Sequence, residues 1–230
     1  MIARRTALAS LAAAPLAAKV QPATRTVAKP MRLKQGDTIG LVAPAGFVAD
    51  RFGLDELGAT VRAMGLVPRF APNLLERYGY LAGTDESRAG ALNAMFRDRE
   101  VRAIFAVRGG WGSERILPML DFRPLAADPR LVIGSSDITA LHLAIAAKTA
   151  CPGLHGPNLA NSWNAAAWDS FRRMVFDGEA PTYGAAAPTE DRLVPRAARI
   201  RTFRPGTARG RLLGGNLSVL SALVGTPFLP

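Results

Sequence analysis

The apolar run "VIG" passes into a helical pattern through Ser135, Ser136 and Asp137, in the stretch "VIGSSDITALHLAIA". A serine on a strand–turn–helix is the setting of a nucleophile elbow, which lifts the hydroxyl clear of the sheet and lets the next N–H group supply half of an oxyanion hole. The second glycine of the G-x-S-x-G pattern is missing, because Ile138 stands in its place. A serine or aspartate cap on a helix over 138–148 explains the residues about as well, so their types and spacing leave nucleophile and cap open.

A second segment suited to chemistry follows another apolar run. "AIFAV" leads directly into Arg108, Gly109, Gly110, Trp111 and Gly112. Glycines at a strand end allow a tight turn and leave backbone N–H groups unshielded, as an anion or oxyanion site requires. A plain glycine-rich turn is the alternative. Because ligands of open α/β sheets bind outside the carboxyl ends of the strands, both segments are candidates for one site.

The elements that must position these segments alternate between strand and helix patterns. Short apolar runs predict strands, or a turn in the last case, over residues 37–46, 67–73, 101–107, 130–134 and 152–156. Helical spacing predicts helices over residues 54–65, 85–98, 114–120, 138–149 and 168–178. The alternation predicts an α/β fold, with a parallel sheet flanked by helices on both faces.

Three parts are expected along the chain. Residues 1–30 form an export signal and linker, and residues 31–180 form the α/β N-terminal domain that carries the serine turn. From about residue 180 the sequence is rich in Pro, Gly and Arg and loses its helical period. Residues 181–230 are therefore expected to be a junction and the start of a smaller, mainly-β C-terminal domain.

The net charge of +11 is concentrated in two places. Residues 1–30 and residues 192–211 carry basic side chains and no acid, and the rest of the chain is close to neutral. A nucleic-acid-binding protein more often has a basic face with interleaved aromatic residues, so we expect no nucleic-acid partner. One cysteine, Cys151, and two histidines exclude a disulfide framework and a Cys- or His-rich metal centre. No apolar run is long enough to span a bilayer as a helix, so no stable membrane insertion is expected.

The first 20 residues, "MIARRTALASLAAAPLAAKV", resemble a secretory leader. A positive start precedes an apolar stretch from Thr6 to Ala18, and small residues offer a cleavage site. Arg4 and Arg5, directly before that stretch, resemble a twin-arginine export signal and predict a periplasmic protein. The alternatives are a cytoplasmic protein with a disordered alanine-rich N-terminus and a misassigned start codon.

The chain resembles the LD-carboxypeptidases, also called muramoyltetrapeptide carboxypeptidases, from about residue 31 to its end. Six blocks occur in the family's order and spacing: "GDTIGLVAPAG", "YLAGTDESRAGALNAMF", "VRAIFAVRGGWGSERILPMLDF", "VIGSSDITALHLAI", "GLHGPN" and "LLGGNLSVLSALVGTPF". These serine peptidases trim muramoyl tetrapeptides in cell wall recycling. The resemblance therefore implies a hydrolase that removes a terminal D-alanine from a muropeptide without a metal or organic cofactor.

The resemblance also assigns roles to residues of the two segments. The family's nucleophile is the serine of G-[YF]-S-D, which falls on Ser136, while Ser135 departs from the aromatic residue that the pattern expects. Gly109, Gly110 and the N–H group of Asp137 are then expected to form the oxyanion hole. Three further residues are expected to bind substrate, namely Arg108, Trp111 and Asn216. Packing over the glycines by Trp111, a turn at Asn216, and exposed strand positions for the arginines of 192–211 are the structural alternatives.

The family's remaining catalytic residues are a Glu and a His beyond the "GGNL" segment. No acidic residue follows Asp191 and no histidine follows His155. We therefore expect the chain to be truncated before the C-terminal part, as a fragment or a natural product, and its activity to be impaired. His155 is the one plausible local base, although a structural histidine at a strand end is the favoured interpretation. His142 is expected to be a helix residue without a catalytic role.

Two other functions remain open on the sequence. One is the related self-immunity hydrolase, which cleaves a toxic peptide–nucleotide. The other is a catalytically dead module that only binds muropeptides. A homodimer also stays open beside a monomer, because nothing in the sequence separates the two.

Replacing Arg4 and Arg5 by lysine tests the export signal. Fractionation should place a form shortened by about the first 18 residues in the periplasm, and the double substitution should retain the protein in the cytoplasm. A wild-type protein found in the cytoplasm with an intact Met1 would refute export.

Overall fold

The computed structural model of the chain describes residues 27–182, 184 and 201–230. The predicted export signal lies outside the described residues, as does the part of the basic segment between residues 192 and 200. No helix in the described ranges is long and apolar enough to cross a membrane.

Five parallel strands form one sheet, as the sequence predicts, in the order β2-β1-β3-β4-β5. The strands are β1 (Thr38–Val42), β2 (Val67–Phe70), β3 (Val101–Ala106), β4 (Leu131–Gly134) and β5 (Leu154–His155). The central strand β3, "VRAIFA", is buried along almost its whole length. An apolar run of this kind suits a strand that is covered on both faces.

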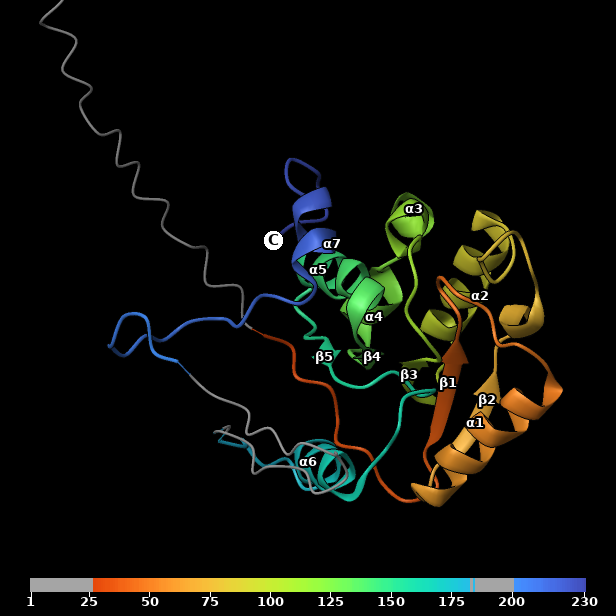
Figure 1. The fold of residues 1–230 in the computed structure, drawn as a ribbon, viewed down its shortest axis with the longest axis horizontal. Coiled ribbons are helices and arrows are strands. Elements are labelled where there is room, and N and C mark those ends of the chain that lie inside the picture. The colour runs from red at the N-terminus through yellow and green to blue at the C-terminus, as the bar shows by residue number, and fades with distance from the viewer. Residues whose placement is uncertain (1–26, 183, 185–200) are drawn as a thin grey trace, which may run out of the picture.

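The long helices cover both faces of the sheet (Figure 1). They are α1 (Arg51–Ala63), α2 (Asp85–Arg97), α5 (Thr139–Lys148) and α6 (Ala165–Val175). Helices α1 and α6 lie on one face, and α2 and α5 lie on the other with two short helices, α3 (Ser113–Ile116) and α4 (Arg123–Ala127). Trp163 and Phe171 bring α6 onto the sheet, with ring centroids 5.8 and 5.6 Å from that of Phe105.

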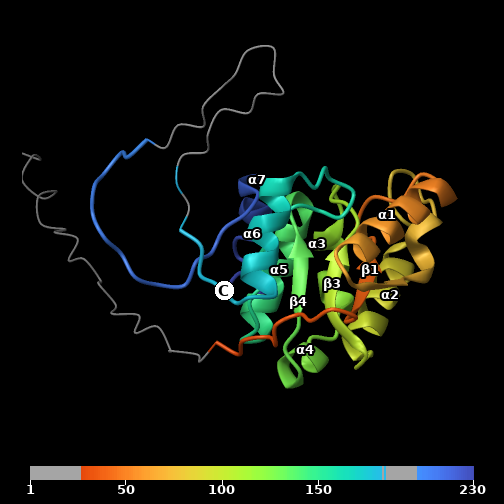
Figure 2. The ribbon, with the colours of Figure 1, turned by 90° about the horizontal axis from the view of Figure 1, so that it is seen from below.

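The strand order creates a crevice at the carboxyl edge of the sheet. The chain runs from β1 outward to β2, and then crosses back over β1 to β3. Because parallel crossovers are right-handed, the reversal puts α1 and α2 on opposite faces of the sheet. Figure 2 shows β1, β3 and β4 side by side at the centre of this arrangement.

Polar caps set where several helices begin. Thr84 caps α2 by accepting a hydrogen bond from the N–H group of Ser87 at 3.2 Å. Helix α1 begins at Arg51, earlier than the helical pattern from residue 54 predicts, because Asp50 caps it through the N–H group of Gly53. Asn164 has the same effect on α6, which begins at Ala165 instead of residue 168.

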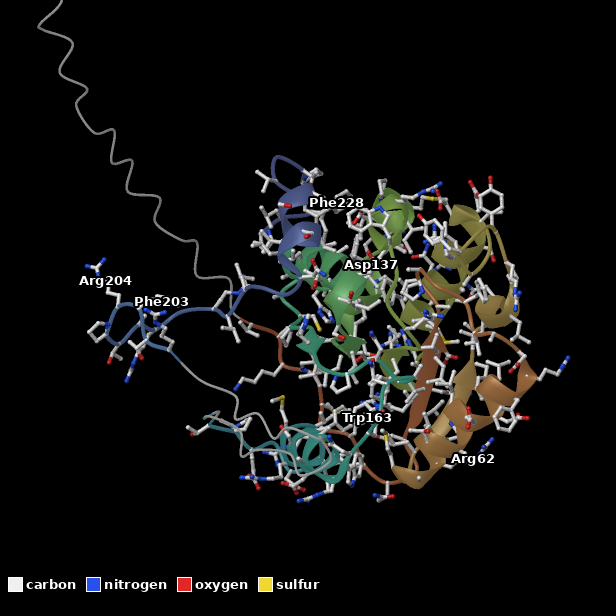
Figure 3. The ribbon with its side chains drawn as sticks, in the orientation of Figure 1. Arg62, Asp137, Trp163, Phe203, Arg204 and Phe228 are labelled. Carbon is white, nitrogen blue, oxygen red and sulfur yellow. The ribbon has the colours of Figure 1, made fainter. Side chains whose placement is uncertain are left out.

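Residues 201–230 contain one helix, α7 (Leu217–Ala222), and no strand. The short strands expected after residue 180 are therefore not found in this described stretch, and a mainly-β C-terminal domain stays a prediction. Helix α7 packs on α5, and the side chains of Val219 and of Leu223, directly after the helix, are buried. In contrast, Phe203 and Arg204 stand away from the body of the protein (Figure 3).

Candidate functional site

The turn after β4 holds Ser136 in a backbone conformation that side chains rarely adopt. Its φ angle is +61°, and it is the one residue other than glycine with a positive φ in the described ranges. A left-handed backbone costs a residue with a Cβ about 1–2 kcal/mol, so the surrounding structure must impose it. The side chain of Ser136 is exposed between a buried strand and a buried helix. This is the geometry of a nucleophile elbow.

The side chain of Asp137 does not cap the following helix. Neither α5 nor the 3₁₀ segment Ser136–Ile138 before it has a side-chain cap, so the cap interpretation of the serines and Asp137 is wrong. Asp137 is fully buried, and its Oδ2 accepts a hydrogen bond of 2.9 Å from the N–H group of Ser113, the first residue of α3. The carboxylate therefore joins the serine turn to the end of the glycine-rich loop; Figure 3 shows Asp137 in the interior near α3 and α5.

The glycine-rich loop after β3 packs directly against the serine turn. A Cβ on Gly109 would lie 3.2 Å from Cβ of Ser136 and 3.5 Å from the backbone nitrogen of Asp137. Glycine thus keeps open the approach to the N–H group that an oxyanion hole would use. The carbonyl of Gly109 also accepts a hydrogen bond of 3.3 Å from the N–H group of Gly46, in the loop after β1.

A buried arginine fastens the loops after β1 and β3 to each other. The side chain of Arg88, on α2, is fully buried and donates to the carbonyls of Pro44 and Gly112, the latter at 2.9 Å. Its charge is paired with Asp85, which also binds Arg115 at 2.9 Å. Both Nη atoms of this buried cation are paired, whereas its Nε has no partner among the described residues, so the two carbonyls are needed to offset the cost of burying the charge.

Asn158, in the loop after β5, holds the beginning of the serine turn. Its Oδ1 accepts a hydrogen bond of 2.9 Å from the N–H group of Ser135. A Cβ on Gly134 would lie 2.8 Å from that same oxygen, so glycine at this position permits the contact.

These loops surround a cavity of about 700 Å³ at the carboxyl edge of the sheet. Ser136, Gly109, Gly110 and Arg108 line it on one side, with Phe47 from the loop after β1. The opposite wall comes from α1, and the loop after β5 completes the lining, with Glu56, Thr60, Asn158 and Asn161 as polar members. The structure therefore brings four of the sequence-predicted residues to one cavity, while Asp137 lies buried beneath it.

Besides the buried Asp137, two further predicted site residues lie outside this lining. Trp111 is 50% exposed and does not line the described cavity. Asn216 caps α7, accepting from the N–H groups of Ser218 and Val219, and its own N–H group donates to Thr139 Oγ1 at 2.9 Å. In the described structure Asn216 joins α7 to α5.

The two histidines and the cysteine do not face Ser136 across the cavity. His142 is buried in α5 and donates to the Val132 carbonyl at 2.9 Å, and burial lowers its pKa to about 4. The ring of His155 lies 5.9 Å from that of His142, and neither ring lines the described cavity. Burial raises the pKa of the Cys151 thiol to about 11, so at neutral pH it is not a reactive thiolate.

Arg88 and Asn158, together with the α1 wall of the cavity, are not predicted from the sequence. Asn158 lies in the "GLHGPN" block, but an asparagine near a proline reads as an ordinary turn residue. The "DESRAG" pattern places Arg88 on a helix, where an arginine is most often exposed. The α1 wall carries no local signal, because strand order alone brings α1 beside the loop after β3.

Fold and site together define an α/β domain with a serine elbow and an adjoining glycine-rich loop. Residues 39–156 match the family model described as the LD-carboxypeptidase N-terminal domain. The chain belongs to the LD-carboxypeptidase family.

Relatives and a solved structure extend this assignment. A probable murein peptide carboxypeptidase of Bacillus subtilis is 36% identical over 205 residues, which are 87% of this chain and 60% of the relative. The microcin C7 self-immunity protein of Escherichia coli is 27% identical over 171 residues, 66% of this chain and 50% of that protein. The crystal structure of muramoyltetrapeptide carboxypeptidase from Oxalobacter formigenes is similar with a TM-score of 0.65 at 25% identity, covering 84% of this chain and 62% of that one. The chain thus spans 50–62% of the length of these three proteins.

Proposed function

We propose that Ser136 is the nucleophile of a serine-type LD-carboxypeptidase that removes the terminal D-alanine from muramoyl tetrapeptides during peptidoglycan turnover. The observation that carries the proposal is the exposed, left-handed Ser136 at the junction of β4 and α5, facing the cavity beside Gly109. Strain of this kind is retained where it serves a site. Family membership and the names of the relatives support the substrate class.

The chemistry divides peptide hydrolysis into two steps. Oγ of Ser136 attacks the carbonyl between an L-centre residue and D-alanine, and its proton passes to a general base. N–H groups of Gly109, Gly110 and Asp137 hold the negative charge that develops on the carbonyl oxygen. The C–N bond then breaks, D-alanine leaves with a proton on its amine, and water hydrolyses the ester on Ser136 to release the shortened peptide.

Arg108 is the residue that we assign to the carboxylate of the leaving D-alanine. It lines the cavity next to the oxyanion loop, and its Nη1 lies 3.4 Å from the Phe47 carbonyl. A guanidinium suits a carboxylate because it can donate two parallel hydrogen bonds. A free terminal carboxylate distinguishes the substrate of a carboxypeptidase from the interior of a peptide.

By the resemblance, the general base and the residue that orients it belong to a part of the relatives that lies beyond the segment matching "GGNL". Among the residues that line the described cavity there is no histidine. A serine hydroxyl without an adjacent base is a poor nucleophile. We therefore propose that residues 31–230 supply the nucleophile, the oxyanion hole and one wall of the substrate site.

A second candidate function is the hydrolysis of a peptide–nucleotide. The similarity to the E. coli microcin C7 self-immunity protein favours it. The two functions share the nucleophile and the oxyanion hole and differ in the group that leaves. Parallel assays with a muramoyl tetrapeptide and a peptide–nucleotide separate them. For the place of action we propose the periplasm, on the strength of the Arg4–Arg5 leader.

Two matched serine variants test the nucleophile. In a fusion of residues 31–230 to the C-terminal part of the B. subtilis relative, Ser136→Ala should abolish the release of D-alanine, because no other hydroxyl occupies the elbow. Ser135→Ala should keep much of the activity, since its backbone and not its side chain is bound by Asn158. The release of D-alanine from a muramoyl tetrapeptide is the measurement, and the reverse pattern would refute the assignment.

The unfused fragment 31–230 should be close to inactive in the same assay. Loss of triad members typically lowers turnover by about four orders of magnitude, with the oxyanion hole and binding retaining a residual rate. Binding of the tetrapeptide without turnover would match the muropeptide-binding alternative. A rate within about tenfold of the fusion would show that a base within these residues completes the site, with His155 the first to be replaced.

A further inference from the structure

Helix α1 contributes one wall of the cavity that Ser136 lines, and an acidic residue lies on that wall. Gly53, Glu56 and Thr60 line the cavity together with the buried Leu57. Their spacing of three and four residues places them on one side of the helix. Glu56 is exposed, and the hydroxyl of Thr60 donates to its carbonyl at 2.9 Å, so that proton is already used within the helix. The carboxylate of Glu56 is therefore the charged group that α1 offers to a ligand in the cavity.

The charged side chains of the cavity form a single pair of opposite sign. Glu56 is the one acidic residue and Arg108 the one basic residue among the residues that line the described cavity. They come from different elements, Glu56 from α1 and Arg108 from the loop after β3. Neither of them forms an ion pair with another described residue. A ligand that matches this lining carries a negative group at one side and a positive group at the other.

The neighbouring arginines do not neutralise Glu56. Arg77 donates to a backbone carbonyl of the loop after β1 at 2.6 Å, and its guanidinium lies over the ring of Phe47 at 4.4 Å. On α1 itself, Arg62 lies beside Gly58, where a Cβ would be 3.1 Å from its Nη1. Within the described ranges no side chain pairs with the carboxylate of Glu56, so this carboxylate is available to a ligand.

A carboxylate on the wall of this cavity discriminates between peptides. The proposed substrate ends in a carboxylate, which we assign to Arg108, and a second carboxylate in the same cavity repels such an anion. A cationic group elsewhere in the substrate turns this repulsion into attraction. The side chain next to the scissile carbonyl belongs to the residue before the leaving D-alanine. A long side chain that ends in an amine is therefore the group that extends from the carbonyl at Ser136 to the opposite wall, across a cavity of about 700 Å³.

We propose that Glu56 is a specificity-determining residue, which binds the side-chain ammonium group of the residue before the terminal D-alanine. The inference rests on the proposed function and narrows it to peptides with a diamino acid at that position. Arg108 holds the carboxylate at the end of the peptide and Glu56 holds the ammonium group, so the carbonyl between these two charges is directed to Ser136. The two charges also set the direction of the peptide, because a reversed peptide would bring like charges together at both walls.

Equilibrium binding of two tetrapeptides to the full 230-residue chain tests the contact. The muramoyl tetrapeptide that has lysine before D-alanine is compared with the same molecule that has norleucine there, which lacks only the amine. The wild-type chain should bind the lysine peptide about tenfold more tightly, the effect of one hydrogen-bonded charge pair. Glu56→Gln should remove that preference by weakening the binding of the lysine peptide, because the amide keeps the shape and loses the charge. Asp55→Asn, at the neighbouring exposed carboxylate outside the described lining, should retain it.

The outcomes separate this inference from the proposed function. A preference for the lysine peptide that survives in Glu56→Gln overturns the inference, as does equal binding of the two peptides by the wild type. Binding of neither peptide refutes the proposed substrate site and the inference with it. Binding is measured without turnover, so the predicted preference in a chain that releases no D-alanine would uphold the contact and count against the proposed reaction alone.

The salt dependence of the same binding shows whether charge or shape produces the preference. Ion pairs near the surface are screened by salt, so the wild-type preference for the lysine peptide should shrink between about 0.05 M and about 0.5 M sodium chloride. The affinity for the norleucine peptide provides the reference at each concentration, because both peptides have the same terminal carboxylate. A lysine preference that does not change with salt would contradict a contact between the ammonium group and Glu56.

Discussion

The hydrogen bond from the Ser113 N–H group to the buried carboxylate of Asp137 joins the two turns on which the candidate site depends. One turn carries Ser136 after β4, and the other carries the glycine-rich loop after β3. Parallel strands bring the two turns to the same edge of the sheet, but pairing between strands ends before either turn begins. The buried carboxylate continues that alignment into the loops, because its hydrogen bond ties the serine turn to the end of the glycine-rich loop. Without it, two loops of independent flexibility would have to form one oxyanion hole.

Several energetically unfavourable features of the protein lie at this carboxyl edge of the sheet. Ser136 has a left-handed backbone, Arg88 buries a charge, and Asp137 buries a carboxyl group. A packed apolar core around β3 offsets these costs, because β3 and the helices on both faces bury apolar side chains almost completely. Concentration of strain and buried charge at one edge of an otherwise regular sheet is what a functional site requires.

The local parts of this structure are predictable from the sequence, and the long-range parts are not. Apolar runs and helical spacing predict the parallel sheet, and the strand–turn–helix pattern indicates the turn of Ser135, Ser136 and Asp137, because these signals come from neighbouring residues. The choice of Ser136 comes from the resemblance to the LD-carboxypeptidases. The partner of Asp137 cannot be predicted in this way. An aspartate at this position suits a helix cap as well as a hydrogen bond to Ser113, which lies 24 residues away. Arg88 gives no signal either, since a charged residue on a helix is most often solvent-exposed. The cavity depends on strand order, which brings α1 and the loop after β3 together only in three dimensions.

Glycine and alanine variants of Ser136 measure the strain in the elbow most directly, because both lose the hydroxyl and only alanine keeps a Cβ. If the backbone is left-handed at this residue, Ser136→Gly will be more stable to urea than Ser136→Ala by about 1 kcal/mol. Ser135, with a φ of −143°, provides the control: there glycine should be less stable than alanine by about 0.5–1 kcal/mol, since it loses more backbone entropy on folding. Equal stabilities of the two Ser136 variants, or a more stable alanine variant, would contradict a strained nucleophile elbow.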